Sequence, residues 1–238
     1  MRDNWKTAVV CSGACGGAEA EPGLLLLPYR RSFVPTYHAW MADPYLLAAT
    51  SSERLTEDEE FAAQRAWVDD PQKCTFIVFD RALHEGACAA AAGGGLAYGR
   101  SAQGMVGDAN LFLLDSDVVA QDYFGGTQCA GGAAEVMVMI AEAAYRRKGY
   151  ARRAVAALMW YGATALGLRR FVAKISEDNA PSLALFTHKL GFREVRRVAA
   201  FGEVHLALEL GEGGAGLGSE AFALAPCEPA PEDNELAA

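Results

Sequence analysis

The stretch from Glu135 to Gly167 constrains the fold more than any other part of the chain. Its first part, Val136 to Ile140, is β-branched and methionine-rich and too short for a helix, which is typical of a buried strand. After Tyr145 the apolar residues recur at spacings of three and four, which predicts a helix that ends near Gly167. Because Arg170 to Ile175 then alternates as a second strand, the pattern predicts a βαβ unit with parallel strands.

A basic turn, Arg146-Arg147-Lys148-Gly149-Tyr150-Ala151, joins the predicted strand to the predicted helix. The first N–H groups of a helix have no intrahelical partner and lie at the positive end of the helix dipole, so they favour an anion. Gly149 lets a ligand approach the backbone closely, and five cationic side chains between positions 146 and 153 add positive charge. We therefore predict a phosphate-binding loop; the alternative is a solvated basic first turn, which the dipole disfavours.

Two motifs resemble the GNAT family of acetyltransferases. The string Arg146-x-x-Gly149-x-Ala151 is similar to the family's [QR]-x-x-G-x-[GA] loop, which holds the pyrophosphate of acetyl-coenzyme A. The segment NAPSLALF at 179–186, followed by Leu190-Gly191-Phe192, resembles the second family signature. Four further segments, PYRRSFVPTYHAWM, DPQKCTFIVFD, GDANLFL and EVMVMIAE, are similar to the N-acetyltransferase 9 group. The resemblance covers about Leu24 to Leu210 and implies an α/β GNAT fold, a central mixed β-sheet flanked by helices.

This resemblance also implies a reaction, the attack of an amine on the acetyl thioester of acetyl-CoA. The implied acceptor is a protein N-terminal α-amine, with tubulin N-termini among the candidates. Since an α-amine has a pKa of about 8, its deprotonation near neutral pH does not need a strong base. Glu135 matches the position where several GNAT enzymes carry a glutamate base; the alternative is a structural glutamate at a strand edge.

The resemblance further implies which residues bind the co-substrate. The pantetheine arm should pair with backbone groups and lie along the second signature, and the pyrophosphate should lie on the basic turn. The expected residues are Met139, Ile140 and Ala141 for the backbone pairing, Arg146, Arg147, Lys148, Gly149, Tyr150, Ala151 and Arg152 for the pyrophosphate, and Asn179, Ser182 and Phe186 along the arm.

Phe186 departs from the family pattern, because many members carry a tyrosine there that protonates the leaving thiolate. Water, Tyr145 or Tyr150 are alternative proton donors, and the sequence does not rank them. The departure keeps open two other hypotheses. One is a coenzyme-A-binding protein that acts through a partner such as microtubules, and the other is an acetyltransferase of small amines.

Composition sets outer bounds on the protein. A chain of 238 residues, 52% hydrophobic and 21% charged, is expected to form one globular domain. The net charge of −9 argues against general nucleic-acid binding, and no stretch approaches the ~18 apolar residues of a membrane span. The six cysteines include no C-x-x-C pair, so we expect reduced thiols, a cytoplasmic protein and no metal site.

Four segments are predicted to lack regular structure. Residues 1–22 should be a disordered extension, with a targeting leader as the alternative, and the Ala- and Gly-rich stretch near 82–104 a flexible insertion. The Gly-rich stretch from Ser116 to Ala134 should be a long loop. Residues 211–238, which are acidic and rich in Gly, Ala and Pro, should be a disordered tail, and the domain at 23–210 should fold without it. His38, His188 and His205 are interpreted as structural.

Overall fold

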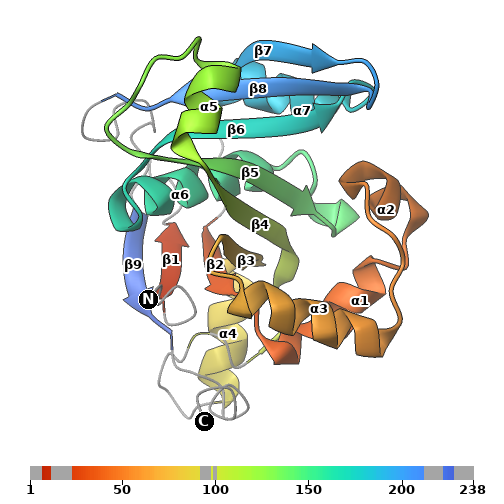
Figure 1. The fold of residues 1–238 in the computed structure, drawn as a ribbon. Coiled ribbons are helices and arrows are strands. Elements are labelled where there is room, and N and C mark those ends of the chain that lie inside the picture. Colours follow the sequence, from red (N-terminus) through yellow and green to blue (C-terminus); the bar gives the residue numbers. More distant parts are fainter. Residues whose placement is uncertain (1–6, 12–22, 92–97, 99–100, 212–221, 228–238) are drawn as a thin grey trace.

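A nine-stranded mixed sheet runs through the molecule in the order β7-β8-β6-β5-β4-β3-β2-β1-β9 (Figure 1). The structure, a computed structural model, describes residues 7–11, 23–91, 98, 101–211 and 222–227. The strands are β1 (Thr7–Cys11), β2 (Leu24–Pro28), β3 (Lys73–Asp80), β4 (Met105–Leu114), β5 (Gly132–Ile140), β6 (Leu168–Ser176), β7 (Arg193–Val198), β8 (Glu203–Glu209) and β9 (Phe222–Pro226). The prediction of an α/β fold with a mixed sheet is confirmed.

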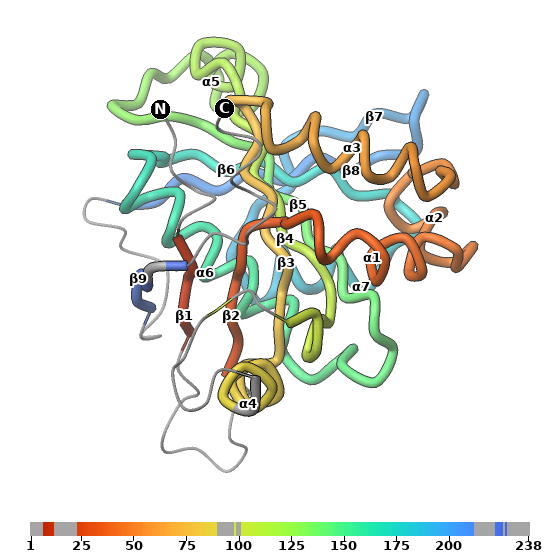
Figure 2. Tube along the Cα trace, turned by 90° about the horizontal axis from the view of Figure 1, so that it is seen from below, coloured from red at the N-terminus to blue at the C-terminus, as the bar shows by residue number. Residues whose placement is uncertain are grey.

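Helices cover both faces of this sheet, so the core is divided into two main parts (Figure 2). The helix α6 packs on one face, whereas α1, α2 and α3 lie together on the other. The helices are α1 (Val34–Trp40), α2 (Pro44–Thr50), α3 (Glu57–Asp69), α4 (Arg81–Ala91), α5 (Ser116–Tyr123), α6 (Tyr150–Ala165) and α7 (Ala180–Ala184). None of the helices in the described ranges is long and apolar enough to cross a membrane.

The predicted βαβ unit is present as β5, α6 and β6. Its two strands pair in parallel, and the described sheet pairs are otherwise antiparallel. The helix α6 buries an apolar face that includes Val155, Leu158 and Met159, as its spacing of three and four predicts. At α3, Thr56 and Glu59 form the capping box that the sequence indicates.

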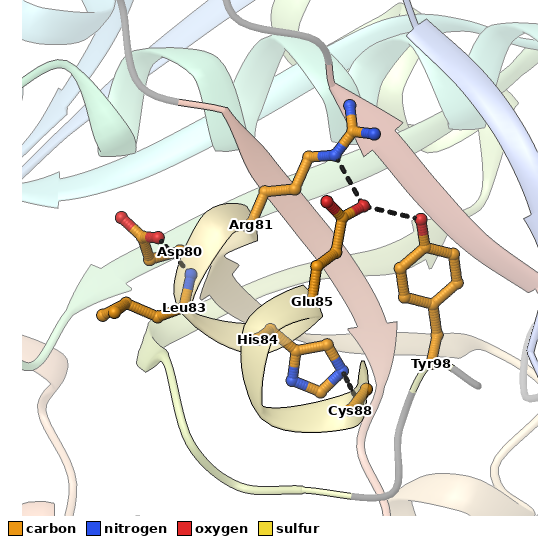
Figure 3. A network of polar contacts seen from close by, with 7 residues as sticks. All are labelled: Asp80, Arg81, Leu83, His84, Glu85, Cys88 and Tyr98. Carbon is orange, nitrogen blue, oxygen red and sulfur yellow. Dashed lines mark hydrogen bonds and ion pairs between the residues drawn. The ribbon is translucent and has the colours of Figure 1, made fainter. Parts of the chain in front are cut away.

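Two helices occupy segments that were predicted to be irregular. The helix α4 lies where we expected a flexible insertion, because its alanines have the highest helix propensity of any residue. Figure 3 shows how α4 is held: Arg81 Nε donates to Glu85 Oε1 at 2.8 Å, and the Tyr98 hydroxyl donates to the same carboxylate at 2.9 Å. The helix α5 begins at Ser116 because Asp115 accepts hydrogen bonds from two first-turn N–H groups.

The structure also differs from the expected disorder at both ends of the chain. Thr7–Cys11 and Phe222–Pro226 form β1 and β9, which pair with each other at the edge of the sheet. Composition did not predict them because each strand is five residues long and lies in a Gly- and Ala-rich segment. Their stability depends on partners distant in sequence. The rest of the expected extension and tail, 1–6, 12–22, 212–221 and 228–238, lies outside the described residues.

Candidate active site

The central feature of the site is the separation of two parallel strands. β5 pairs with β6 only from Gly132 opposite Leu168 to Glu135 opposite Val172. Beyond that point β5 continues to Ile140 and β6 to Ser176, and the described residues show no further pairing between them. Backbone groups on the β6 side of β5 can therefore pair with an extended ligand, as in strand addition. Met139 and Ile140, two of the predicted pantetheine contacts, lie in this part of β5.

The basic turn lies directly after this opening, before α6. Arg147 (φ 63°) and Gly149 (φ 88°) both have left-handed backbones, and a Cβ atom at Gly149 would meet no atom within 4 Å. Among the described residues, no side chain caps the first N–H groups of α6. Arg147 and Lys148 are exposed. This geometry suits a phosphate group, since free first-turn N–H groups and nearby cations attract anions.

Three side chains in the basic turn and in the first turn of α6, those of Arg146, Arg153 and Tyr150, make hydrogen bonds within the protein. Arg146 donates to the backbone carbonyls of Ile140 (2.9 Å) and Ala141 (2.7 Å), so it fixes the turn to the end of β5. Arg153 is fully buried and donates to Cys11 Sγ at 2.8 Å. The positive charge that we expected from five cationic side chains between positions 146 and 153 therefore comes from fewer than five of them.

The Tyr150 side chain also points away from solvent. Its hydroxyl donates to the Asp80 carboxylate, and burial raises its pKa well above the ordinary value, with the hydrogen bond to Asp80 adding to the effect. The hydroxyl proton of Tyr150 is thus held in a hydrogen bond to Asp80. Tyr145, the other candidate proton donor, is half-buried and packs edge-on against Tyr150, with ring centroids 5.2 Å apart.

Glu135 is the last residue of β5 that pairs with β6, and its carboxylate is in an ion pair. Lys174 Nζ lies 2.6 Å from Glu135 Oε2, and the side chains are 35% and 15% exposed, respectively. Burial lowers the pKa of Lys174, but the hydrogen bond and charge of Glu135 outweigh it, so the pKa is raised. The pair therefore consists of an ammonium and a carboxylate. The sequence did not indicate this partner, because the contact depends on strand register.

The second signature has a structural role in this molecule. Asn179 caps α7 by accepting a hydrogen bond from the Ser182 N–H at 3.2 Å. The Phe186 ring is buried against Phe192, with centroids 5.0 Å apart and an edge-on orientation. The three contacts predicted along the arm, Asn179, Ser182 and Phe186, therefore belong to the segment that follows β6.

A polar group on the other side of β5 was also missed. Asp108 of β4 is 4% exposed and accepts hydrogen bonds from Asn110 Nδ2 (2.8 Å) and the Tyr37 hydroxyl (3.4 Å). Burial raises its pKa to about 6, and these hydrogen bonds partly offset the rise. The polar alternation in GDANLFL was the available signal, since it puts Asp108 and Asn110 on one face of a strand.

The helix α1 is tied to the end of β5. Trp40 Nε1 donates to Glu142 Oε1 at 2.8 Å, just after the strand ends. Arg146 stacks over the ring of Tyr45 in α2, with 5.0 Å between the guanidinium carbon and the ring centroid. These two contacts hold α1 and α2 beside the opening, where they can form one wall of a site. In the described ranges, no group of three or more His, Cys, Asp or Glu side chains could hold a metal ion.

Comparison with known proteins gives a consistent family. Residues 23–193 match the model of the acetyltransferase (GNAT) domain. An "N-acetyltransferase 9-like protein" of Nematostella vectensis is 38% identical over 186 residues, covering 78% of this chain and 82% of that protein. The Homo sapiens protein named "Alpha/beta-tubulin-N-acetyltransferase 9" is 40% identical over 190 residues, covering 79% and 81%.

Solved structures support the fold. The RimL ribosomal L7/L12 alpha-N-protein acetyltransferase superposes with a TM-score of 0.57 at 14% identity, covering 84% of this chain and 100% of that chain. The spermidine N-acetyltransferase of Vibrio cholerae, in complex with CoA and spermine, gives 0.55 at 15% identity, covering 78% and 95%. At these identities the likeness concerns the fold alone.

Proposed function

The chain belongs to the GNAT acetyltransferases, and we propose that it transfers the acetyl group of acetyl-CoA to the N-terminal α-amine of a protein. The observation that supports this most is the opening between β5 and β6, followed directly by the turn at Gly149. One end of the opening has unpaired strand edges, and the other end has uncapped helix N–H groups. A long molecule with an amide-containing arm and a pyrophosphate fits both.

The residues at the opening have separate tasks in this proposal. The open edge of β5 at Met139, Ile140 and Ala141 lies along the arm of acetyl-CoA, whose thioester supplies the activated acetyl group. The backbone groups of this edge that are not held by Asp108 or Arg146 pair with the arm. Arg147, Lys148 and the N–H groups from Gly149 to Arg152 hold the pyrophosphate. Arg146 contributes by fixing the turn to the carbonyls of Ile140 and Ala141.

Glu135 is the proposed proton acceptor. It lies where β5 and β6 separate, and it faces the side of the sheet opposite α6, together with Met137 and Met139. Lys174 keeps it oriented through the ion pair. A carboxylate in an ion pair is a weak base, but a weak base is sufficient for an α-amine whose pKa is about 8. Among the proton donors for the thiolate, Tyr145 or water is favoured over Tyr150, because the Tyr150 hydroxyl already donates its hydrogen bond to Asp80.

The relatives suggest the acceptor. Three of them are named as alpha/beta-tubulin N-acetyltransferases, and this chain covers 69%, 81% and 82% of their lengths. We therefore propose α- and β-tubulin N-termini as the first acceptors to test. Spermidine is the small-amine comparison, because a structural neighbour is a spermidine N-acetyltransferase.

Titration calorimetry and an acetylation assay test the proposal together. The parent protein should bind acetyl-CoA, and mass spectrometry should find the acetyl group on the first residue of tubulin peptides. Gly149→Leu should weaken binding at least tenfold, since a left-handed backbone strains a branched residue and its side chain would obstruct the phosphate.

Gly125→Leu is the matched control, because Gly125 also has a left-handed backbone, with no atom within 4 Å of a Cβ position, but lies away from the turn. It should retain the parent affinity. If Gly149→Leu binds acetyl-CoA as tightly as the parent, the assignment of the phosphate loop is wrong. Acetylation of spermidine but of no peptide would move the function to small amines.

A further inference from the structure

Asp108 lies two residues after an irregularity in β4. Val78 of β3 lies opposite Gly107, whereas Phe79 lies opposite Met105, so Val106 has no partner in β3. An extra residue of this kind is a β-bulge, which bends the strand and redirects the next side chain. Just beyond this bulge, the carboxylate of Asp108 accepts a hydrogen bond from the backbone of the neighbouring strand β5.

The atoms around this carboxylate come from three parts of the molecule. Asn110 donates from β4, the Tyr37 hydroxyl donates from α1, and the backbone N–H of Met139 donates from β5. The titratable groups that face the cluster are Tyr37 of α1, Tyr29 after β2 and Glu60 of α3. The residues directly opposite Asp108 in the neighbouring strands, Ile77 of β3 and Met139 of β5, do not titrate. In the described part of the chain, no lysine or arginine is in an ion pair with Asp108.

Considered for its effect on folding alone, this arrangement of buried polar groups lowers the stability of the protein. A buried carboxylate without a cation loses its hydration and is only partly compensated by neutral donors. Three other polar atoms on the same face, Tyr29 Oη, Thr75 Oγ1 and Asn110 Oδ1, are buried and have no hydrogen-bond partner among the described residues. Buried groups of this kind concentrate at functional sites, where another requirement outweighs the cost.

We propose that Asp108 is a positioning residue for acetyl transfer, which holds the backbone of Met139 where β5 has separated from β6. This inference rests on the proposed function, which puts acetyl-CoA along the same half of β5. Both backbone groups of Met139 are held from β4: Asp108 binds its N–H, and its carbonyl oxygen lies against Gly107, at 1.9 Å from where a Cβ atom would be. Asp108 itself does not react, because it acts through this backbone.

The main test is Asp108→Asn, which keeps the shape of the side chain and one carbonyl oxygen. We expect the acetylation rate at saturating substrates to fall at least tenfold, while the Tm stays near the parent value. Glu60→Gln is the matched control, since it neutralises the other buried carboxylate of the cluster without touching Met139. A parent rate in Asp108→Asn, or an equal loss in Glu60→Gln, overturns the proposal.

Hydrogen exchange gives a readout that does not depend on activity or on the identity of the acceptor. In Asp108→Asn the amides of residues 139–141 should exchange at least tenfold faster than in the parent, whereas those of β2 and β3 should not change. Unchanged exchange at residues 139–141 overturns the positioning role even if the acceptor is not a protein. If the two proteins differ in exchange at residues 139–141 as expected, but the parent acetylates no protein N-terminus, the result would contradict the proposed function and leave the positioning role intact.

Tyr37→Phe serves if Asp108→Asn does not fold. It removes one hydrogen bond that lowers the pKa of Asp108, so the carboxyl should take up its proton at higher pH. Loss of amide protection at residues 139–141 on acidification should then begin at a higher pH than in the parent. An identical pH dependence in the two proteins overturns the proposal.

Discussion

At the scale of single residues, the ion pair of Glu135 with Lys174 makes a specific kinetic prediction. Glu135→Gln removes the proton acceptor but keeps the shape, so we expect acetyl-CoA affinity to persist and the rate to fall by about 10- to 100-fold. The loss should be largest at low pH, where more of the amine is protonated. Steady-state rates from pH 6 to 9 measure it.

Glu194→Gln is the control for this substitution, because Glu194 also forms a 2.6 Å ion pair, with Arg197, but on the exposed strand β7. It should leave the rate unchanged. An equal rate for Glu135→Gln and the parent at every pH would remove Glu135 from the mechanism and leave it as a cross-strand structural pair.

Asp108 should make folding stability depend on pH in a defined direction. Its pKa is raised to about 6 in the fold, so the folded protein binds this proton more readily than the unfolded chain does. Its contribution to stability therefore increases as the pH falls through 6 and is lost as the pH rises. Between pH 7 and pH 5 the gain is roughly 1 kcal/mol.

Urea unfolding at both pH values measures this contribution as a difference between proteins. The stability of the parent relative to Asp108→Asn should rise by that amount on going from pH 7 to pH 5. The comparison cancels the other titrating groups, which both proteins share. A relative stability that does not change on acidification would show that Asp108 stays ionised throughout this range.

At the scale of elements, β4 and β5 approach each other so closely at Gly107 that no side chain fits. A Cβ atom there would lie 1.9 Å from the Met139 carbonyl oxygen and 2.9 Å from Ile140 Cα, both of which are backbone atoms. Gly107→Ala must therefore displace β5 at the proposed pantetheine contacts. We expect weaker acetyl-CoA binding and a lower Tm, measured by calorimetry and thermal unfolding.

Gly86→Ala in α4 is the matched substitution, since a Cβ atom there meets no atom within 4 Å. It should raise stability by about 0.5 to 1 kcal/mol, because alanine favours a helix interior over glycine. If Gly107→Ala is as harmless as Gly86→Ala, the strands can separate at this point and the close contact does not define the site.

The elements that the sequence predicted correctly are those with a strong local pattern. The strand β5, the turn at Gly149 and the helix α6 follow from periodicity and helix-start chemistry within 33 residues. The helix α4 was missed because an alanine run was interpreted as low complexity, although the same run favours a helix. The capping box at Thr56 was predictable because both of its partners lie within one turn.

The interactions at the site were less predictable than the elements, since they connect strands whose register the sequence does not state. Lys174 meets Glu135 across β5 and β6, and Asp108 meets Met139 across β4 and β5. The role of Arg146 changed for a similar reason. Its position in the motif suggests a phosphate contact, whereas in the structure its guanidinium binds two carbonyls at the end of β5.

At the scale of the whole molecule, the two ends of the described chain close one edge of the sheet. β1 has three fully buried residues, Ala8, Val9 and Cys11, and β9 lies along its outer side from Phe222 to Pro226. Phe222 packs on Trp160 of α6, with ring centroids 5.6 Å apart, and Arg30 donates to Cys227 Sγ at 2.9 Å. The segment 222–227 therefore contacts both faces of the sheet.

This edge predicts how truncation affects stability. A chain that ends after Cys227 keeps β9 and should unfold at the parent temperature, whereas one that ends at Gly211 loses the strand and leaves the outer edge of β1 unpaired. Burial of one large side chain contributes about 2 kcal/mol, so the shorter chain should lose roughly that amount. For a domain of this size, the corresponding fall in Tm is about 4 to 8 °C.

Thermal unfolding of the two truncated chains, with acetyl-CoA binding measured on both, distinguishes an edge strand from a dispensable tail. Both chains should bind acetyl-CoA, because β9 lies five strands away from β5 in the order of the sheet. The chain ending at Gly211 should also aggregate more readily, since the unpaired N–H and C=O groups of an exposed edge strand can pair with another molecule. Equal Tm values for the two chains would mean that β9 adds nothing to the stability of the domain.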